Sequence, residues 1–97
     1  MNLTKDIISK IGFKSEHPER SLNNFELNEF GKYHISLMFQ YKPMSNSIEI
    51  NCDCNKINSN GIVVKRAYLS NIKTVEELQK LFDLCEIEFK IDSKYFS

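Results

Sequence analysis

The 97-residue sequence contains no tryptophan, one alanine, two prolines and three glycines. So little proline and glycine excludes collagen-like chains and proline-rich disordered chains. No apolar run approaches the roughly 18 residues of a membrane-spanning helix, so we expect no membrane partner. With 41% hydrophobic and 27% charged residues, the composition is that of an ordinary folded chain. We therefore predict a single domain over residues 1–97.

An excess of charge of one sign is also absent, because 13 Lys and Arg residues balance 13 Asp and Glu residues. This balance disfavours a strongly basic nucleic-acid-binding protein. The charges are unevenly distributed, however. Residues 56–73 carry four basic residues and no acid, whereas residues 74–92 carry six acids and two lysines. The favoured interpretation is that these segments are solvated faces of a strand and a helix, and the alternative is that the acidic helix or the basic segment meets a partner.

The first residues, 1–6, lack the charged, apolar and small-residue succession of a signal peptide, so we expect a cytoplasmic protein. An odd number of cysteines, three, then indicates free thiols rather than a disulfide framework. The basic residues are 11 lysines and two arginines, and isoleucine and asparagine are abundant. This bias is typical of AT-rich coding sequences and favours a bacterium or its phage as the source.

Two segments show apolar residues at helical spacing. The first predicts a short helix over residues 4–11 that ends at Gly12. The second follows Thr74 and Glu77, which form a capping box: the hydroxyl and the carboxylate each accept from the other residue's backbone amide. A helix over about residues 75–85 should therefore pack on the rest of the fold.

Other segments alternate apolar and polar residues, as half-buried strands do. They are residues 24–29, 33–41, 48–54, 62–69 and 87–91. The element order α-β-β-β-β-α-β predicts an α+β two-layer sandwich, in which two helices cover one face of an antiparallel sheet of about four to five strands.

The faces of these strands are not equally clear. The uncovered face of the sheet should display His34, Ser36, Met38, Gln40, Glu49, Asn51 and Asp53. The buried face of residues 62–69 is ambiguous, because branched and aromatic residues occupy both alternating sets. The strand order is not determined by the pattern.

Cys52, Cys54 and Cys85, together with a histidine, have the chemistry of a tetrahedral zinc site. The competing interpretation is stronger, because Cys52 and Cys54 continue the inward face of a strand and Cys85 continues a helical apolar stripe. Metal-binding cysteine pairs also usually have two to four intervening residues. We therefore predict core cysteines, with no metal and no cofactor.

A catalytic constellation is not evident. Neither His17 nor His34 lies in a motif that joins it to a nucleophile and an orienting carboxylate. Glu49 and Asp53 are carboxylates of the kind that any solvated strand face offers. We therefore predict that the protein is not an enzyme.

Two groups of residues are candidates for binding. Lys65 and Arg66 can contact phosphates while Tyr68 stacks on a base, which is how single-stranded nucleic acids are bound. Acidic residues of the second helix can instead imitate nucleic acid and occupy a basic groove on a partner. They are Glu76, Glu77 and Asp83.

The stretch from residue 72 to residue 85, with its capping box and apolar stripe, resembles the C-terminal half of small uncharacterised proteins carried by phages and mobile elements of AT-rich bacteria. The resemblance implies a protein that binds a host machine, in a class that includes anti-CRISPR inhibitors. Our leading hypothesis is thus a non-catalytic binding protein, a phage-encoded inhibitor of a host nucleic-acid-processing complex. The partner would be a host protein or ribonucleoprotein.

Two alternatives remain open. The first is a nucleic-acid-binding module that contacts RNA or DNA through the basic segment 56–73. The second is a structural or regulatory homodimer subunit, joined through the edge of the strand predicted at residues 87–91.

Overall fold

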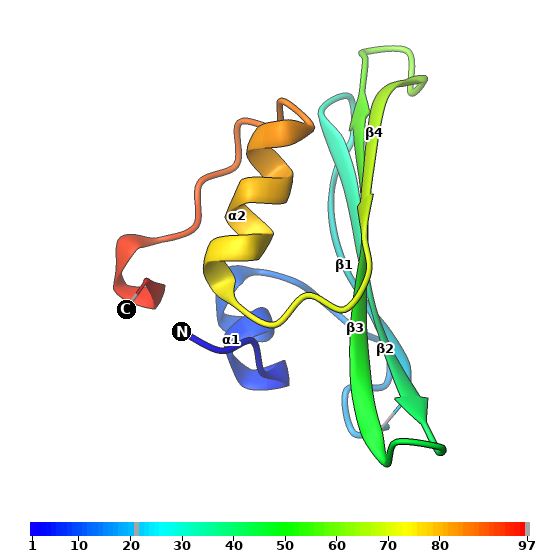
Figure 1. Cartoon of the computed structure of the whole chain (residues 1–97). Coiled ribbons are helices and arrows are strands. Elements are labelled where there is room, and N and C mark those ends of the chain that lie inside the picture. The colour runs from blue at the N-terminus through cyan, green and yellow to red at the C-terminus, as the bar shows by residue number, and fades with distance from the viewer. Residues whose placement is uncertain (21, 97) are drawn as a thin grey trace.

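The computed structural model describes residues 1–20 and 22–96. It contains, in chain order, α1 (Lys5–Ile11), β1 (Asn23–Glu29), β2 (Tyr33–Lys42), β3 (Ser47–Ile57), β4 (Val63–Leu69), α2 (Val75–Leu84) and the short 3-10 helix η1 (Ser93–Tyr95). The four strands form one antiparallel sheet in the order β1-β2-β3-β4. Both helices lie on one face of this sheet (Figure 1), which confirms the predicted α+β two-layer sandwich.

Both helices begin where the sequence predicts. The hydroxyl of Thr4 accepts from the backbone amide of Ile7 at 3.2 Å, and Gly12 ends α1 at a φ of 128°. The hydroxyl of Thr74 likewise accepts from the amide of Glu77 at 3.2 Å. The carboxylate of Glu77 accepts from the Thr74 hydroxyl, also at 3.2 Å, and not from its backbone amide as we predicted. In the described residues, neither helix is long and apolar enough to cross a bilayer.

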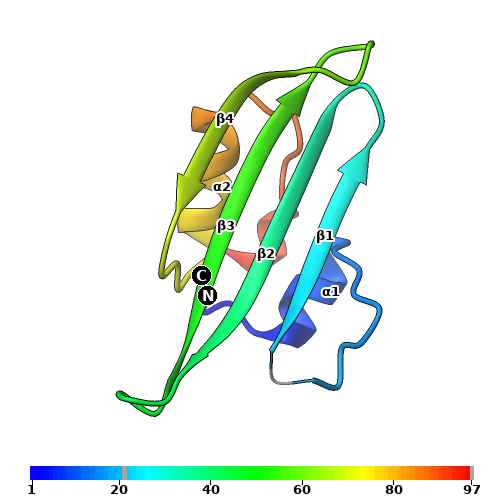
Figure 2. The same cartoon turned by 90° about the vertical axis from the view of Figure 1, so that its right-hand side faces the viewer.

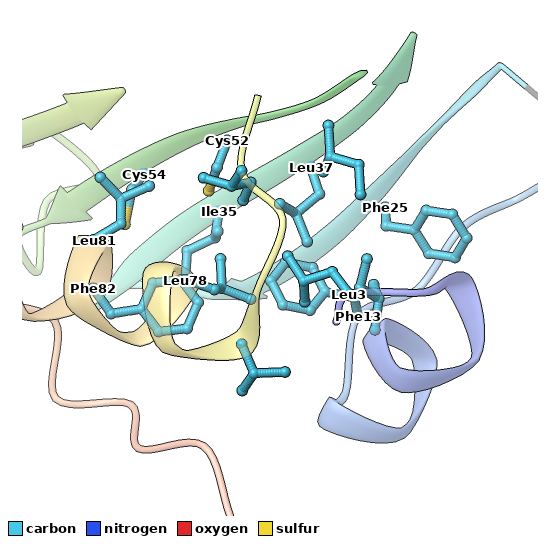
Figure 3. Packing of buried hydrophobic residues seen from close by; sticks show 14 of the residues in the cluster. Leu3, Phe13, Phe25, Ile35, Leu37, Cys52, Cys54, Leu78, Leu81 and Phe82 are labelled. Atoms are coloured by element: carbon cyan, nitrogen blue, oxygen red, sulfur yellow. The ribbon is translucent and has the colours of Figure 1, made fainter. Parts of the chain in front are cut away.

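The core lies between the helices and the inward face of β1, β2 and β3 (Figure 3). Alternate residues of these strands are buried, as the pleat of a strand requires. The sheet contributes Phe25, Ile35, Leu37, Phe39, Ile50, Cys52 and Cys54, and the helices contribute Ile8, Val75, Leu78, Leu81 and Phe82. The ring of Phe82 also meets that of Phe89 edge to face, with 5.9 Å between centroids.

The strand predicted over residues 87–91 is wrong: this segment is irregular and runs along the helical layer (Figure 1). Its alternation arises because Ile87 and Ile91 are buried in the core beside α2. The side chain of Gln79, and not a neighbouring strand, forms hydrogen bonds with the backbone of this segment. Its amide donates to the carbonyl of Phe89 at 3.2 Å and its carbonyl accepts from the amide of Ile91 at 2.8 Å. A dimer joined through this segment therefore has no strand edge to use.

Candidate interaction surface

The strand β4 lies at one edge of the sheet (Figure 2), and part of its backbone faces outward. Ile50 is an inward-facing residue of β3, and its carbonyl accepts from the amide of Ile72, just beyond β4, at 2.9 Å. Alternate residues of a strand direct their N–H and C=O groups to the same side. The inward-facing residues of β3 therefore direct their backbone groups toward β4. Because successive residues of a strand bond to opposite neighbours, Ala67 and Leu69 bond to β3. The backbone N–H and C=O groups of Arg66 and Tyr68 therefore point away from the sheet.

A β-bulge lies at the start of β4. The register shifts between Lys56 and Ile57, so that Lys56 faces Lys65 while Ile57 faces Val63. The extra residue in β4 is Val64. A bulge strengthens the local twist and interrupts regular pairing, so only the part of β4 from residue 65 to residue 69 is straight.

Large apolar side chains are exposed along this edge. They are Ile62, Val63, Val64, Tyr68 and Leu69 from β4 and its preceding turn, and Leu84 from the end of α2. The end of α2 lies beneath β4, because the thiol of Cys85 donates to the carbonyl of Lys65 at 3.6 Å. We call these six residues and the outward backbone of β4 the β4 surface. Exposed apolar groups gathered at one place are a mark of protein–protein contact.

The ambiguity of residues 62–69 has a simple explanation. Neither alternating set is buried, and in β4 only Ala67 is half-buried. Although the end of α2 lies beneath β4, the helix-side residues Lys65 and Leu69 remain exposed, and the bulge moves Val63 opposite Ile57 on the open face. Branched residues on both faces of a strand are thus the sequence signal of an exposed apolar edge.

The predicted basic candidates do not form one patch, because consecutive strand residues point to opposite faces. Lys65 lies on the helix side, where its ammonium is 3.4 Å from the carboxylate of Glu86. Arg66 lies on the open face and donates two hydrogen bonds of 2.8 Å to Asp53, which raise the pKa of its guanidinium. Tyr68 is exposed and lies opposite Asp53 in the register.

The predicted acidic candidates are each bound within the chain. Glu76 contacts the amino terminus of Met1 at 3.0 Å, and Glu77 takes part in the cap of α2. Asp83 accepts from Lys90 at 2.7 Å and from Gln79, and these hydrogen bonds lower the pKa of its carboxyl group. Each of the three carboxylates therefore already serves a contact that helps to hold the helical layer.

The open face of the sheet carries the polar residues that the sequence predicts, in the register Ser36–Asp53, Met38–Asn51 and Gln40–Glu49. Its charges are largely paired. The imidazole of His34 lies 3.3 Å from the carboxylate of Glu26, and Lys42 contacts Glu49. These pairs leave little charge of one sign on this face for a phosphate backbone or an acidic peptide.

The three cysteines are buried core residues. The thiol of Cys85 donates to the carbonyl of Cys54 at 3.3 Å. Burial raises the pKa of Cys52 to about 12 and also raises that of Cys54. Within residues 1–20 and 22–96, no group of three or more histidine, cysteine or acidic side chains is arranged to hold a metal ion.

A hollow of about 480 Å³ lies between the β1–β2 turn and the segment after α2. Tyr33 and Phe89 supply its aromatic walls, with 6.1 Å between ring centroids. Lysines and glutamates alternate around the rest of the rim. This mixture of charges does not select one class of small ligand.

Comparisons with protein-family models, with curated proteins and with solved structures find no significant match. Function is therefore inferred from the chain's own residues and their arrangement.

Proposed function

We propose that the protein is a non-catalytic binding protein that engages another protein through the β4 surface. The observation that carries this proposal is the combination, at one edge, of outward backbone groups at Arg66 and Tyr68 with exposed apolar side chains. An exposed strand edge is a template for a further strand, and flanking apolar side chains add affinity and specificity.

The surroundings of the reactive side chains support a non-catalytic role. The imidazoles of His17 and His34 lie near the carboxylates of Glu19 and Glu26, but all four side chains are exposed to solvent, which weakens such contacts. All three thiols are buried, and a raised pKa keeps those of Cys52 and Cys54 in the protonated, unreactive form.

The finer proposal concerns the partner. A phage-encoded inhibitor of a host nucleic-acid-processing complex, such as a CRISPR nuclease, acts by occupying a protein surface, and the β4 surface suits that kind of contact. Direct binding of RNA or DNA gains less support, because Lys65 and Arg66 lie on opposite faces and both are paired with carboxylates.

The test is an affinity capture from a lysate of cells that carry the chain, with and without nuclease. The tagged wild type is compared with the double variant Val64→Lys/Tyr68→Lys. The matched control is Met44→Lys, because Met44 is a fully exposed apolar side chain in the β2–β3 turn at the opposite end of the sheet (Figure 2).

We expect one protein complex to be captured by the wild type and by Met44→Lys, to survive nuclease and to be lost with the double variant. Equal capture by all three proteins would place the binding surface elsewhere. Capture that disappears with nuclease would favour the nucleic-acid-binding alternative, and nothing captured by any of them would remove the proposal.

A further inference from the structure

The straight part of β4 is complementary to itself. In an antiparallel pair of two copies of this strand, only residues whose backbone groups point outward can exchange hydrogen bonds. Those residues are Arg66 and Tyr68. A two-fold axis that passes beside Ala67 places Arg66 of each copy opposite Tyr68 of the other, so both outward residues of both copies find partners.

This register also avoids the conflicts of the two registers that are shifted toward the bulge. An axis beside Arg66 sets two arginines directly opposite each other and pairs the bulged Val64 with Tyr68. An axis beside Lys65 sets two lysines opposite each other. With the axis beside Ala67, the two small alanines meet, Lys65 faces Leu69, and the guanidinium of Arg66 lies beside the ring of Tyr68, as cation–π contacts require.

The exposed apolar residues on the helix side favour a second copy over an isolated peptide. Leu69 pairs with the buried Cys52 and so lies on the helix side of the sheet, yet it is exposed, as is Leu84 at the end of α2. A single added strand would cover the backbone edge but would bring no second layer. A second copy brings its own α2 to the same side of the joined sheet, where the two Leu84 side chains and the two Leu69 side chains can be covered.

We propose that the β4 surface is occupied by a second copy of this chain, giving a two-fold dimer with one continuous sheet and its axis beside Ala67. This inference rests on the proposed function, because it names the partner of the same surface. The dimer would leave the open face of both sheets, with its paired charges, available on one side of the assembly.

The test measures the molar mass of the full chain by light scattering, from dilute to concentrated solution. Two variants of one exposed residue carry opposite charge. Tyr68→Lys sets a positive charge opposite Arg66 of the second copy, whereas Tyr68→Glu sets a negative charge there. Within one copy, residue 68 lies opposite Asp53, so the lysine should stabilise the monomer more than the glutamate does. The order of the two variants in monomer stability is therefore the reverse of their expected order in dimer affinity. A stability effect within the monomer therefore cannot imitate the expected result.

We expect the wild type to reach twice 11.4 kDa and Tyr68→Glu to dimerise more tightly than Tyr68→Lys, by about tenfold because the changed pair occurs twice. Equal dissociation constants for the two variants would overturn the register, and a mass of 11.4 kDa at every concentration would overturn the dimer. A monomer whose capture of a host protein still depends on Val64 and Tyr68 would keep the proposed function and reject this inference alone. A dimer that captures no host protein would keep this inference and reject only the phage-inhibitor form of the proposed function.

Discussion

The two edges of the sheet are built differently. At the β1 edge, the backbone of Lys14 both donates to and accepts from that of Glu26, with two hydrogen bonds of 2.8 Å. The side chains on the outer face of this strand are polar. At the β4 edge, no backbone hydrogen bond to the outward side of Arg66 or Tyr68 is found in the described residues, and the neighbouring side chains are apolar.

This difference makes the β4 edge, and not the β1 edge, the place where a further strand can be added to the sheet. Proteins usually protect edge strands with covering segments, charges or bulges, because an open edge invites association. Here Lys14, in the segment after α1, pairs with the outward backbone groups of β1 at Glu26. At β4, the bulge interrupts the open edge only at Val63 and Val64. The remaining open part, residues 65–69, is the part that we propose pairs with a second copy of itself.

The largest contrast should come from aromatic residues at the two edges. Phe25 of β1 is 1% exposed, whereas Tyr68 of β4 is 58% exposed. Phe25→Ala should lower the free energy of unfolding by about 3–5 kcal/mol, because it leaves a cavity in the core. Tyr68→Ala should change it by no more than about 0.5 kcal/mol in dilute solution. Urea denaturation of both variants decides this, and a large loss with Tyr68→Ala would mean that β4 is part of the core.

A second contrast uses proline to remove one backbone donor at each edge. Lys14→Pro removes the bond to the Glu26 carbonyl and should lower the free energy of unfolding by about 1 kcal/mol. Tyr68→Pro removes a donor that points outward, so it should leave the monomer's stability nearly unchanged while weakening the dimer. The denaturation midpoints in dilute solution check both. The comparison of the edges fails if Tyr68→Pro destabilises the monomer as much as Lys14→Pro does.

A smaller effect reports on the core behind β4. Because the pKa of Cys52 is raised from 9.0 to about 12, the folded state holds this proton while the unfolded state loses it. The stabilisation is complete below pH about 9 and should be lost progressively as the pH rises toward 12. The urea midpoint of the wild type should fall over this range, and that of Cys52→Ala should fall less. Parallel curves for the two proteins would show that the thiol contributes nothing.

The smallest effect is expected on the open face. Asp53→Asn removes the negative charge and one of the two acceptor oxygens that hold Arg66, which is exposed to solvent. We expect no measurable change in the urea midpoint, since exposed ion pairs contribute little. Single-stranded RNA at low salt should bind neither the wild type nor this variant. Binding that appears only in Asp53→Asn would show that the carboxylate masks a nucleic-acid contact.

Much of the fold follows from local patterns. Both helix starts depend on a threonine beside an apolar stripe, at Thr4 and Thr74, and each cap is completed within one helical turn. The strands β1, β2 and β3 alternate clearly because one face of each is covered. The α+β arrangement then follows, since two amphipathic helices need an apolar sheet face.

The remaining features depend on contacts between distant parts of the chain. Residues 87–91 alternate like a strand, but only the folded chain shows that Gln79 takes their backbone groups. Our sequence analysis selected Arg66 and Tyr68 for contacts with phosphates and bases, whereas the structure places them at a strand edge. That edge was not predictable, because the strand order and the bulge at Val64 depend on pairing partners that no local pattern specifies.

Hydrogen exchange at the backbone amides of Arg66, Tyr68 and Glu26, measured by NMR in dilute and concentrated solution, tests the open, self-pairing β4 edge most directly. We expect the Glu26 amide to be protected at both concentrations, whereas those of Arg66 and Tyr68 should exchange rapidly when dilute and become protected when concentrated. Rapid exchange of Arg66 and Tyr68 at both concentrations would contradict the dimer. Protection of these amides in the dilute monomer would contradict the open edge itself.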